Sequence, residues 1–255
     1  MMKKILKSFF LFICFLGQPS CSEAAPPWQK IEEGIEYLRI DTKQGEFSTQ
    51  FTLHAFRIDP KNFRFDLVNA SDYSSPKLTA REFSEKSGAL LVINGSFFDE
   101  SAKPLGLLVQ NKKLIQTVRN TEWGVFLMEG GKPFITHRRD FGINPTTEMA
   151  LQTGPRLVVN GTIPRLKEAI PSRRSLVAIT PDNKVILAVT GSTITETQDL
   201  AQLVARKENK GGLGVSYALN LDGGGSTQLY LTTSSFTYHF AGDTGVANGI
   251  AVFRK

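Results

Sequence analysis

Apolar and polar residues alternate along much of the chain with the two-residue period of β-strands. Phe63, Phe65 and Leu67 alternate with polar residues, which predicts a strand with one buried face. Other apolar runs of strand length are separated by Gly-Gly, Asn-Gly and Pro-Asp-Asn turns. We expect strands or hairpins at 51–53, 90–93, 107–114, 125–134, 157–161, 176–189, 218–221, 229–231 and 250–253.

Two segments carry the start signals of helices instead. Residues 79–82 read Thr-Ala-Arg-Glu, a capping box, and Gly88 is placed to end the helix that this box opens. A second capping box at 195–198 opens a helix that we expect to end near 211–212. The pattern predicts an α+β fold: a strand-rich single domain with a mixed or antiparallel sheet and a few packed helices.

The first residues have the pattern of a targeting segment. Lys3, Lys4 and Lys7 precede an apolar run at 9–16 that is too short to span a bilayer. Small residues at 24–25 offer a cleavage site. We therefore predict a signal peptide at 1–24, a mature domain at 25–255, and a secreted or periplasmic protein.

Both cysteines, Cys14 and Cys21, lie in this leader. A chain cleaved after Ala24 therefore has no thiol nucleophile, no disulfide and no cysteine-ligated metal. The alternative is a lipoprotein anchored through Cys21, but Gln18 stands where such a site needs a leucine. No second apolar stretch has the length of a membrane span, so we expect no stable span after processing.

Charge and histidine spacing narrow the classes of partner. The formal net charge is +6 over 255 residues, and no run of lysine or arginine exceeds two. This predicts no nucleic-acid partner, whereas a mildly basic surface suits an anionic glycan. His54, His137 and His239 are scattered without metal-site spacing, so we expect no metal and no cofactor.

The strongest candidate for chemistry is the loop after the apolar run 218–221. It reads Asp222-Gly223-Gly224-Gly225-Ser226-Thr227 and follows Asn220 and Leu221. Glycines let the backbone bend sharply and turn N–H groups toward a ligand, so a carboxylate would stand beside a cradle for a phosphate or sugar oxygen. The structural alternative is a bulge or tight turn. Three consecutive glycines lose much backbone entropy on folding, which favours a functional role.

A second junction and two arginines add to this site. Residues 94–99 read Asn94-Gly95-Ser96-Phe97-Phe98-Asp99, a mixture of amide, hydroxyl, aromatic and carboxylate groups that suits a sugar. Alternatively, the two rings belong to the core and Asn94 only tolerates a left-handed turn. Arg156 and Arg174 come directly before strands, and guanidinium groups match phosphate oxygens. A solvated surface charge is the alternative for each arginine.

Together these motifs resemble one family. The motifs are Asn94-Gly95-Ser96-Phe97-Phe98, Gly106, Gly154-Pro155-Arg156-Leu157 with Asn160-Gly161, Arg174, and Asn220-Leu221-Asp222-Gly223-Gly224-Gly225-Ser226-Thr227. Over most of the length from Phe51 to Phe253 the chain resembles the phosphodiester glycosidase family. Two positions depart from the family pattern: Ser96 replaces a frequent glycine and Ser175 a frequent threonine, which leaves the substrate open.

The resemblance implies hydrolysis of a sugar-1-phosphodiester at its glycosidic bond, with an N-acetylglucosamine-like sugar as one candidate. Such cleavage needs a carboxylate near the sugar and cations near the phosphate. The implied catalytic residues are Asp222, Asn94, Arg156 and Arg174, with Asn94 holding a sugar hydroxyl and the arginines the phosphate. The implied substrate-binding residues are Gly223, Gly224, Gly225, Ser226, Thr227, Phe98, Asp99 and Asn220, and Asp99 is also the reserve carboxylate. Two alternatives stay open: a non-catalytic binding protein for anionic glycans or envelope polymers, and a phosphodiesterase that breaks the P–O bond.

Overall fold

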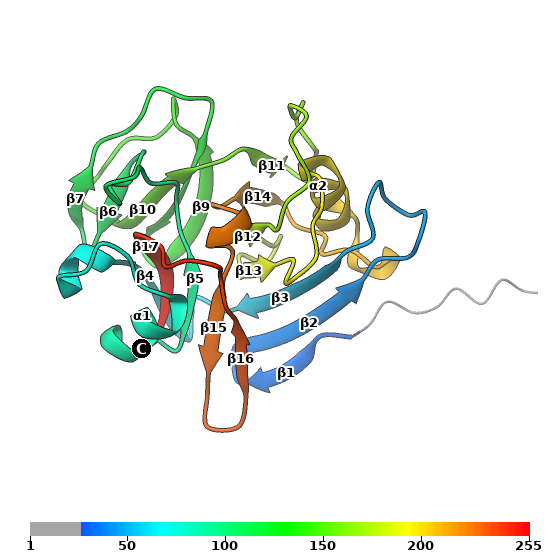
Figure 1. Ribbon diagram of the computed structural model, residues 1–255, viewed down its shortest axis with the longest axis horizontal. Helices are drawn as coiled ribbons and strands as arrows, with labels where there is room; N and C mark the ends of the chain where they lie inside the picture. Colours follow the sequence, from blue (N-terminus) through cyan, green and yellow to red (C-terminus); the bar gives the residue numbers. More distant parts are fainter. Residues whose placement is uncertain (1–26) are drawn as a thin grey trace, which may run out of the picture.

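A computed structural model describes residues 27–255, in which the strands form three antiparallel sheets (Figure 1). The predicted signal peptide, its cleavage site and Cys21 lie outside the described residues. Every strand pair in the described part is antiparallel, which narrows the expected mixed or antiparallel sheet to the antiparallel form. The described chain contains two α-helices, so the fold is mostly β and the α+β expectation is met only in part.

The bounds of the strands follow the spatial order of each sheet. The seven-stranded sheet runs β1 (Gln29–Glu32), β2 (Ile35–Asp41), β3 (Thr52–Ile58), β13 (Val185–Val189), β12 (Ser175–Ile179), β14 (Tyr217–Asn220) and β11 (Arg156–Val159). The second sheet runs β7 (Lys113–Gln116), β6 (Leu108–Gln110), β10 (Thr147–Thr153), β8 (Gly124–Glu129) and β9 (Lys132–His137). The third runs β16 (Thr237–Phe240), β15 (Leu229–Thr232), β5 (Leu91–Asn94), β17 (Asn248–Arg254) and β4 (Phe63–Asn69).

The three sheets share one hydrophobic core. Phe56 of the seven-stranded sheet, Phe126 of the second and Ile93 of the third are fully buried members of the same cluster. The predicted alternation in β4 is confirmed, because Phe63 and Phe65 point into this core. Burial of these apolar faces against one another supplies the main force that holds the sheets together.

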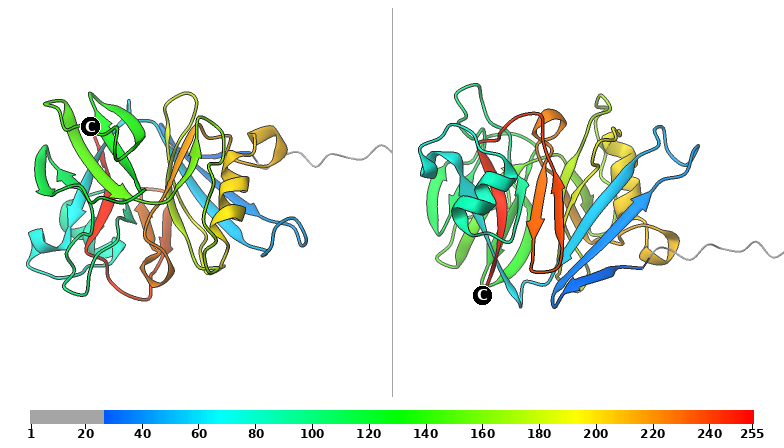
Figure 2. Two further views of the ribbon diagram at one scale, coloured as in Figure 1. Left: turned by 90° about the horizontal axis from the view of Figure 1, so that it is seen from above. Right: turned by 60° about the horizontal axis from the view of Figure 1, so that its bottom comes forward.

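Two helices cover outer faces of the sheets (Figure 2). Helix α2 (Thr197–Ala205) packs Leu200 and Leu203 on the far side of the seven-stranded sheet, and α1 (Ala80–Ser87) packs Phe83 on the third sheet. The predicted capping box of α1 is confirmed: the Thr79 side chain accepts from the Glu82 N–H, and the Glu82 carboxylate accepts from the Thr79 N–H. No helix in the described part is long and apolar enough to cross a membrane.

One prediction about local structure is wrong, and another is met only in part. Helix α2 begins two residues after Thr195, with Glu196 as an N-cap that makes no side-chain capping bond, and it ends at Ala205. The Thr195 backbone is instead paired with Ser172, so it cannot open a helix. The run 157–159 turns back at Asn160-Gly161 as predicted, with Val159 and Thr162 hydrogen-bonded to each other in both directions. The pairing ends at that bridge, and β11 pairs with β14 instead.

Candidate active site

The two predicted motifs meet where strands from different sheets end. Strand β5 ends at Asn94, and the glycine-rich loop starts two residues after β14 ends at Asn220. The Asp222 N–H donates to the Gly95 carbonyl at 3.0 Å, and the Asn94 Nδ2 donates to the Asp222 carbonyl at 2.7 Å. The structure therefore brings together two segments that lie 128 residues apart in the sequence.

Asn94 holds the loop from inside the protein. Its side chain is fully buried, and its Oδ1 accepts from Ser175 Oγ at 2.7 Å and from the Gln228 N–H at 3.1 Å. With its Nδ2 bonded to Asp222, the amide connects β5, β12 and both ends of the loop. The expected contact between Asn94 and a sugar hydroxyl does not fit this burial, because the amide is bonded within the protein at both its oxygen and its nitrogen.

The Asp222 carboxyl is partly shielded from solvent. Its Oδ1 accepts from the Gly223 N–H at 2.9 Å. Burial raises the pKa of Asp222, and hydrogen bonds from the Ser226 side chain and the Gly223 N–H oppose that rise. The direction of the pKa shift indicates a carboxyl whose ionised form is incompletely solvated, as is common for catalytic carboxylates.

The glycines let the loop approach the chain segment before β12. A Cβ on Gly223 would lie 2.7 Å from the Arg173 carbonyl oxygen, and Gly224 has a φ of +61°. The Gly224 N–H donates to the same carbonyl at 2.9 Å. A residue with a side chain would collide at position 223 and would be strained at the positive φ of position 224, so both positions need glycine. The resulting close approach places Arg174 beside the loop.

The expected cradle of backbone amides is not formed. The N–H groups of Gly224, Ser226 and Thr227 donate to the carbonyls of Arg173, Gly223 and Gly224. Of the N–H groups at 223–227, only that of Gly225 has no partner among the described residues. Thr227 is fully buried and its hydroxyl has no partner there either, so it does not face a ligand. Binding of an anion near this loop therefore depends on side chains.

Those side chains line a cleft of about 600 Å³ beside the loop. Four of the predicted residues contribute to it: Arg156, Arg174, Asn220 and Gly223, which adjoins Asp222. The other lining residues are Phe97, Glu122, Trp123, His137, Gly154, Pro155, Pro164, Arg165, Leu166, Lys167, Glu168, Ala169 and Thr197. The cleft thus combines cations with aromatic rings beside a partly shielded carboxyl.

Arg156 and Arg174, two of the three arginines that line the cleft, form no ion pair within the described residues. The Arg174 guanidinium donates to the carbonyls of Thr195 at 3.3 Å and Ile170 at 2.8 Å, and burial lowers its pKa. Arg156 makes no side-chain hydrogen bond to another described residue. Arg173, in contrast, is paired with Asp243. Glu122 and Glu168 also line the cleft, but neither is paired with Arg156 or Arg174, so these two guanidinium groups are suited to hold an anionic ligand.

Eight of the twelve predicted residues, Asp222 among them, do not line this cleft, and Phe98 and Asp99 make their contacts elsewhere. The Phe98 ring packs with the cluster under α1 and lies 4.8 Å from the Lys77 ammonium, measured to the ring centroid. Asp99 caps its own turn by accepting from the Lys103 N–H at 2.9 Å. Phe97, the neighbour of Phe98, is the ring that reaches the cleft. Trp123 was missed because nothing near it in the sequence indicates that it lies beside Phe97.

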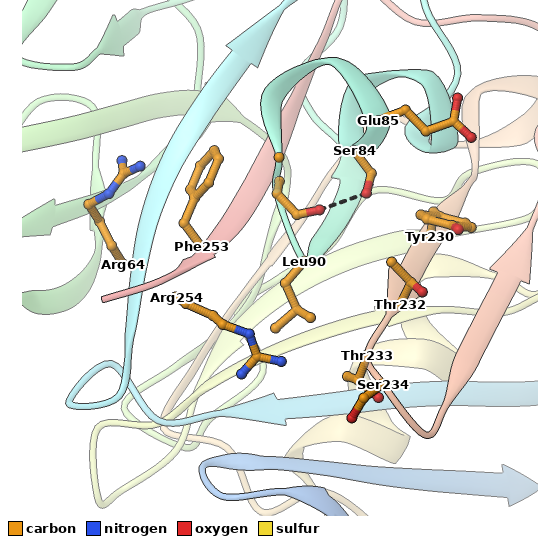
Figure 3. Close-up of a pocket in the computed structure, with 12 residues that line it drawn as sticks. Arg64, Ser84, Glu85, Leu90, Tyr230, Thr232, Thr233, Ser234, Phe253 and Arg254 are labelled. Atoms are coloured by element: carbon orange, nitrogen blue, oxygen red, sulfur yellow. Dashed lines mark hydrogen bonds between the residues drawn. The ribbon is translucent and has the colours of Figure 1, made fainter.

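A second cleft, of about 610 Å³, lies at the opposite end of the third sheet (Figure 3). It adjoins Leu90, which precedes β5, whereas the active-site loop meets the last residue of that strand. Arg254, at its edge, is already paired with both carboxylate oxygens of Glu32 at 2.8 Å. No predicted site residue lines this second cleft. Among residues 27–255, no group of three or more His, Cys, Asp and Glu side chains is arranged to hold a metal ion.

Comparisons with solved structures find similar folds. The fold is similar to that of the zebrafish N-acetylglucosamine-1-phosphodiester alpha-N-acetylglucosaminidase catalytic domain auto-inhibited by its pro-peptide. The TM-score is 0.69 at 14% identity, covering 91% of this chain and 87% of that one. A hypothetical protein from Synechocystis matches with a TM-score of 0.62 at 16% identity, covering 91% of this chain and 64% of that one.

Sequence comparison leads to the same group. An uncharacterized protein of Escherichia coli (strain K12), YigE, is 26% identical over 137 residues, 48% of this chain and 54% of YigE, so the match spans about half of that relative. The sequence profile of the phosphodiester glycosidase family matches residues 87–253, more than half of the chain. This segment contains the Asn94 junction, Arg156, Arg174 and the Asp222 loop. The chain therefore belongs to the phosphodiester glycosidase family.

Proposed function

We propose that this chain is an exported hydrolase that cleaves the glycosidic bond of a sugar-1-phosphodiester. The observation that carries the proposal is the pair Arg156 and Arg174, which have no carboxylate partner in the described residues and line the cleft beside Asp222. Family membership supports the same reaction class. N-acetylglucosamine is the first sugar to test, because the zebrafish enzyme is named for it.

Cleavage of the glycosidic bond requires opposite charges on the two sides of that bond, which Asp222 and the two arginines can supply. When the bond between the anomeric carbon and the phosphate oxygen breaks, positive charge develops on the sugar and the phosphate leaves as an anion. Asp222 supplies negative charge near the sugar, whether as nucleophile, base or electrostatic stabiliser. Arg156 and Arg174 stabilise the departing phosphate, which needs little protonation because it is a good leaving group. Water supplies the new hydroxyl on the sugar carbon.

The supporting residues act through Asp222. Asn94 fixes the backbone at Asp222 and accepts from Ser175 and Gln228, so it sets the position of the carboxyl without touching substrate. Ser226 hydrogen-bonds the Asp222 side chain and thereby moderates its pKa. Pre-organised groups of this kind lower the barrier because they need no rearrangement during the reaction.

Turnover of defined substrates tests the proposal. Purified protein is incubated with N-acetylglucosamine 1-(methyl phosphate) and with matched diesters of other sugars, and release of free sugar is measured. We expect hydrolysis that Asp222→Asn reduces on the order of 10²-fold to 10⁴-fold, the range for loss of a catalytic carboxylate. Full activity in a folded Asp222→Asn protein would remove Asp222 from the mechanism. Binding without turnover would favour a non-catalytic glycan receptor.

Export is the second part of the proposal. The basic and apolar pattern of residues 1–16 supports it. N-terminal sequencing of the protein from cell envelope and medium should find a new terminus just after Ala24 or Ala25. An intact Met1 terminus throughout would contradict export by this route, and a diacylated Cys21 would replace it with membrane anchoring.

A further inference from the structure

Two aromatic rings that line the active-site cleft lie outside the hydrophobic core. Trp123 lies directly before β8, and Phe97 lies three residues after the end of β5. Their ring centroids are 4.9 Å apart with an interplanar angle of 43°, and both residues are half-buried. Neither belongs to the hydrophobic clusters that fill the space between and behind the sheets. Both residues line the cleft.

Glycine at position 154 lets the Trp123 ring lie against the backbone of the cleft. A Cβ on Gly154 would meet the Trp123 Cδ1 at 2.9 Å and Cγ at 3.1 Å. Any side chain there would displace the indole ring, because contacts this short are not tolerated without movement. The Trp123 carbonyl also accepts from the Arg138 N–H at 3.3 Å, which restrains the backbone beside the ring.

Glycine at position 124 leaves room for the side chain of Arg156. A Cβ on Gly124 would lie 2.7 Å from the Arg156 Cγ, so the arginine stem crosses the chain immediately after Trp123. The indole ring and the Arg156 side chain both line the cleft. An aromatic surface next to a phosphate-binding cation matches a ligand with an apolar ring face joined to an anion.

We propose that Trp123, supported by Phe97, is the surface on which the sugar ring of the substrate packs. One face of a pyranose presents C–H groups, and aromatic rings are favourable partners for such faces. With the sugar on Trp123, its anomeric phosphate extends toward Arg156 and Arg174. The proposal rests on the proposed function and adds to it the residue that binds the sugar: Trp123, against an apolar face of the ring.

Fluorescence reports on this contact without catalysis. The chain contains two tryptophans. The other one, Trp28, lies under Arg57, whose Cζ is 4.1 Å from the centroid of the Trp28 ring. In a Trp28→Phe, Asp222→Asn protein, Trp123 is the only tryptophan. Titration with N-acetylglucosamine 1-(methyl phosphate) should then produce a saturable change in emission. Methyl phosphate alone, which has no sugar ring, should produce no comparable change. Binding detected by calorimetry without an emission change specific to the sugar would overturn the proposal.

Kinetics supply the second test, in protein with an intact Asp222. Trp123→Leu keeps apolar volume against Gly154 but removes the flat face, so KM should rise roughly tenfold, about the loss of one aromatic contact, with kcat within about twofold. Trp123→Phe should restore most of the loss, and Trp28→Phe should behave as wild type. A KM within twofold of wild type in folded Trp123→Leu would overturn the proposal.

The failures of the two proposals are distinguishable. A sugar-specific emission change without turnover means that the sugar surface stands and the hydrolase does not. Turnover with a wild-type KM in Trp123→Leu means that the hydrolase proposal stands and the sugar surface at Trp123 does not. If Trp123→Leu does not fold, the titration of the Trp28→Phe, Asp222→Asn protein decides the matter. Absence of both turnover and emission change contradicts both proposals.

Discussion

Asp222 has a carboxyl whose surroundings oppose its ionisation. Burial raises its pKa above the ordinary value near 3.8. If the ionised form is the active one, activity should fall on the acid side with an apparent pKa above that value. A pH profile of kcat/KM measures it. An acid limb at or below the ordinary value would show that the carboxyl in the working enzyme is fully solvated.

The same pKa shift makes a prediction about stability. Because the folded pKa is raised, the ionised carboxyl destabilises the fold, and this effect is absent below the unfolded pKa and complete above the folded pKa. Asp222→Asn should therefore have a higher Tm than wild type at pH 7, and the difference should shrink as the pH falls toward 3. Thermal unfolding at several pH values tests this. A lower Tm for Asp222→Asn than for wild type at pH 7 would contradict a raised pKa of Asp222 in the folded protein.

The adjacent arginines at 173 and 174 offer a matched comparison. Arg174 faces the cleft without an ion pair in the described residues, whereas Arg173 is paired with Asp243. Arg174→Lys keeps the charge but loses the planar donor array, so kcat/KM should fall roughly 10-fold to 100-fold, as for loss of one charge-assisted hydrogen bond. Arg173→Lys should stay close to wild type. Equal losses in both variants would contradict a specific phosphate contact at Arg174.

At this scale the sequence indicated the kinds of residue better than their roles. Arg156 and Arg174 reach the cleft as expected. Of the two adjacent rings, the ring expected to bind, Phe98, packs under α1, whereas Phe97 reaches the cleft. No strand continues through these positions, so alternation gives no guide to which ring points inward. The burial of Asn94 depends on partners more than 80 residues away, which no local pattern reveals.

At the scale of elements, the junction at the end of β5 depends on one amide. Replacing Asn94 with alanine leaves the buried Ser175 hydroxyl and the Gln228 N–H without this acceptor. The free energy of unfolding should fall by about 1–3 kcal/mol, the cost of buried unsatisfied polar groups. Chemical denaturation measures the change. Ser175→Ala removes only one of these hydrogen bonds and should lower the free energy of unfolding by less. An unchanged free energy of unfolding in Asn94→Ala would show that the amide does not stabilise this junction.

The glycine-rich loop makes a second prediction for an element. A Cβ on Gly223 would collide with the Arg173 carbonyl oxygen at 2.7 Å, whereas a Cβ on Gly225 would make an ordinary contact of 3.4 Å with Asp243. Gly223→Ala should therefore lower both Tm and kcat, because the loop must move away from β12. Gly225→Ala is the control and should keep a near wild-type Tm. Equal tolerance at both positions would show that the close approach is not needed.

The sequence predicted elements best where their determinants are local. The α1 capping box and the β12–β13 hairpin are confirmed because a few neighbouring residues determine them. Strands β1, β2, β10 and β16 were missed, and the start of α2 was placed too early. At Thr195 a pairing with Ser172 overrides the local capping signal. Local propensity is a weak guide wherever such tertiary pairing competes with it.

At the scale of the whole molecule, the site exists because three sheets pack around one core. Strand β5 of the third sheet and β14 of the seven-stranded sheet end at the same place, where the Asn94 and Asp222 segments are hydrogen-bonded. Trp123, at the start of β8, brings in the second sheet. Hydrophobic alternation shows that strands exist but not which sheet each one joins, so the meeting of these ends could not be read from the sequence.

The most direct test of glycosidic cleavage is to run the reaction in water labelled with oxygen-18. The substrate is N-acetylglucosamine 1-(methyl phosphate), or another sugar-1-phosphodiester that the protein hydrolyses. Mass spectrometry of the methyl phosphate product shows which bond broke. Cleavage between the anomeric carbon and oxygen predicts methyl phosphate without label, because water attacks carbon. Label in methyl phosphate would mean that water attacks phosphorus, and would contradict glycosidic cleavage.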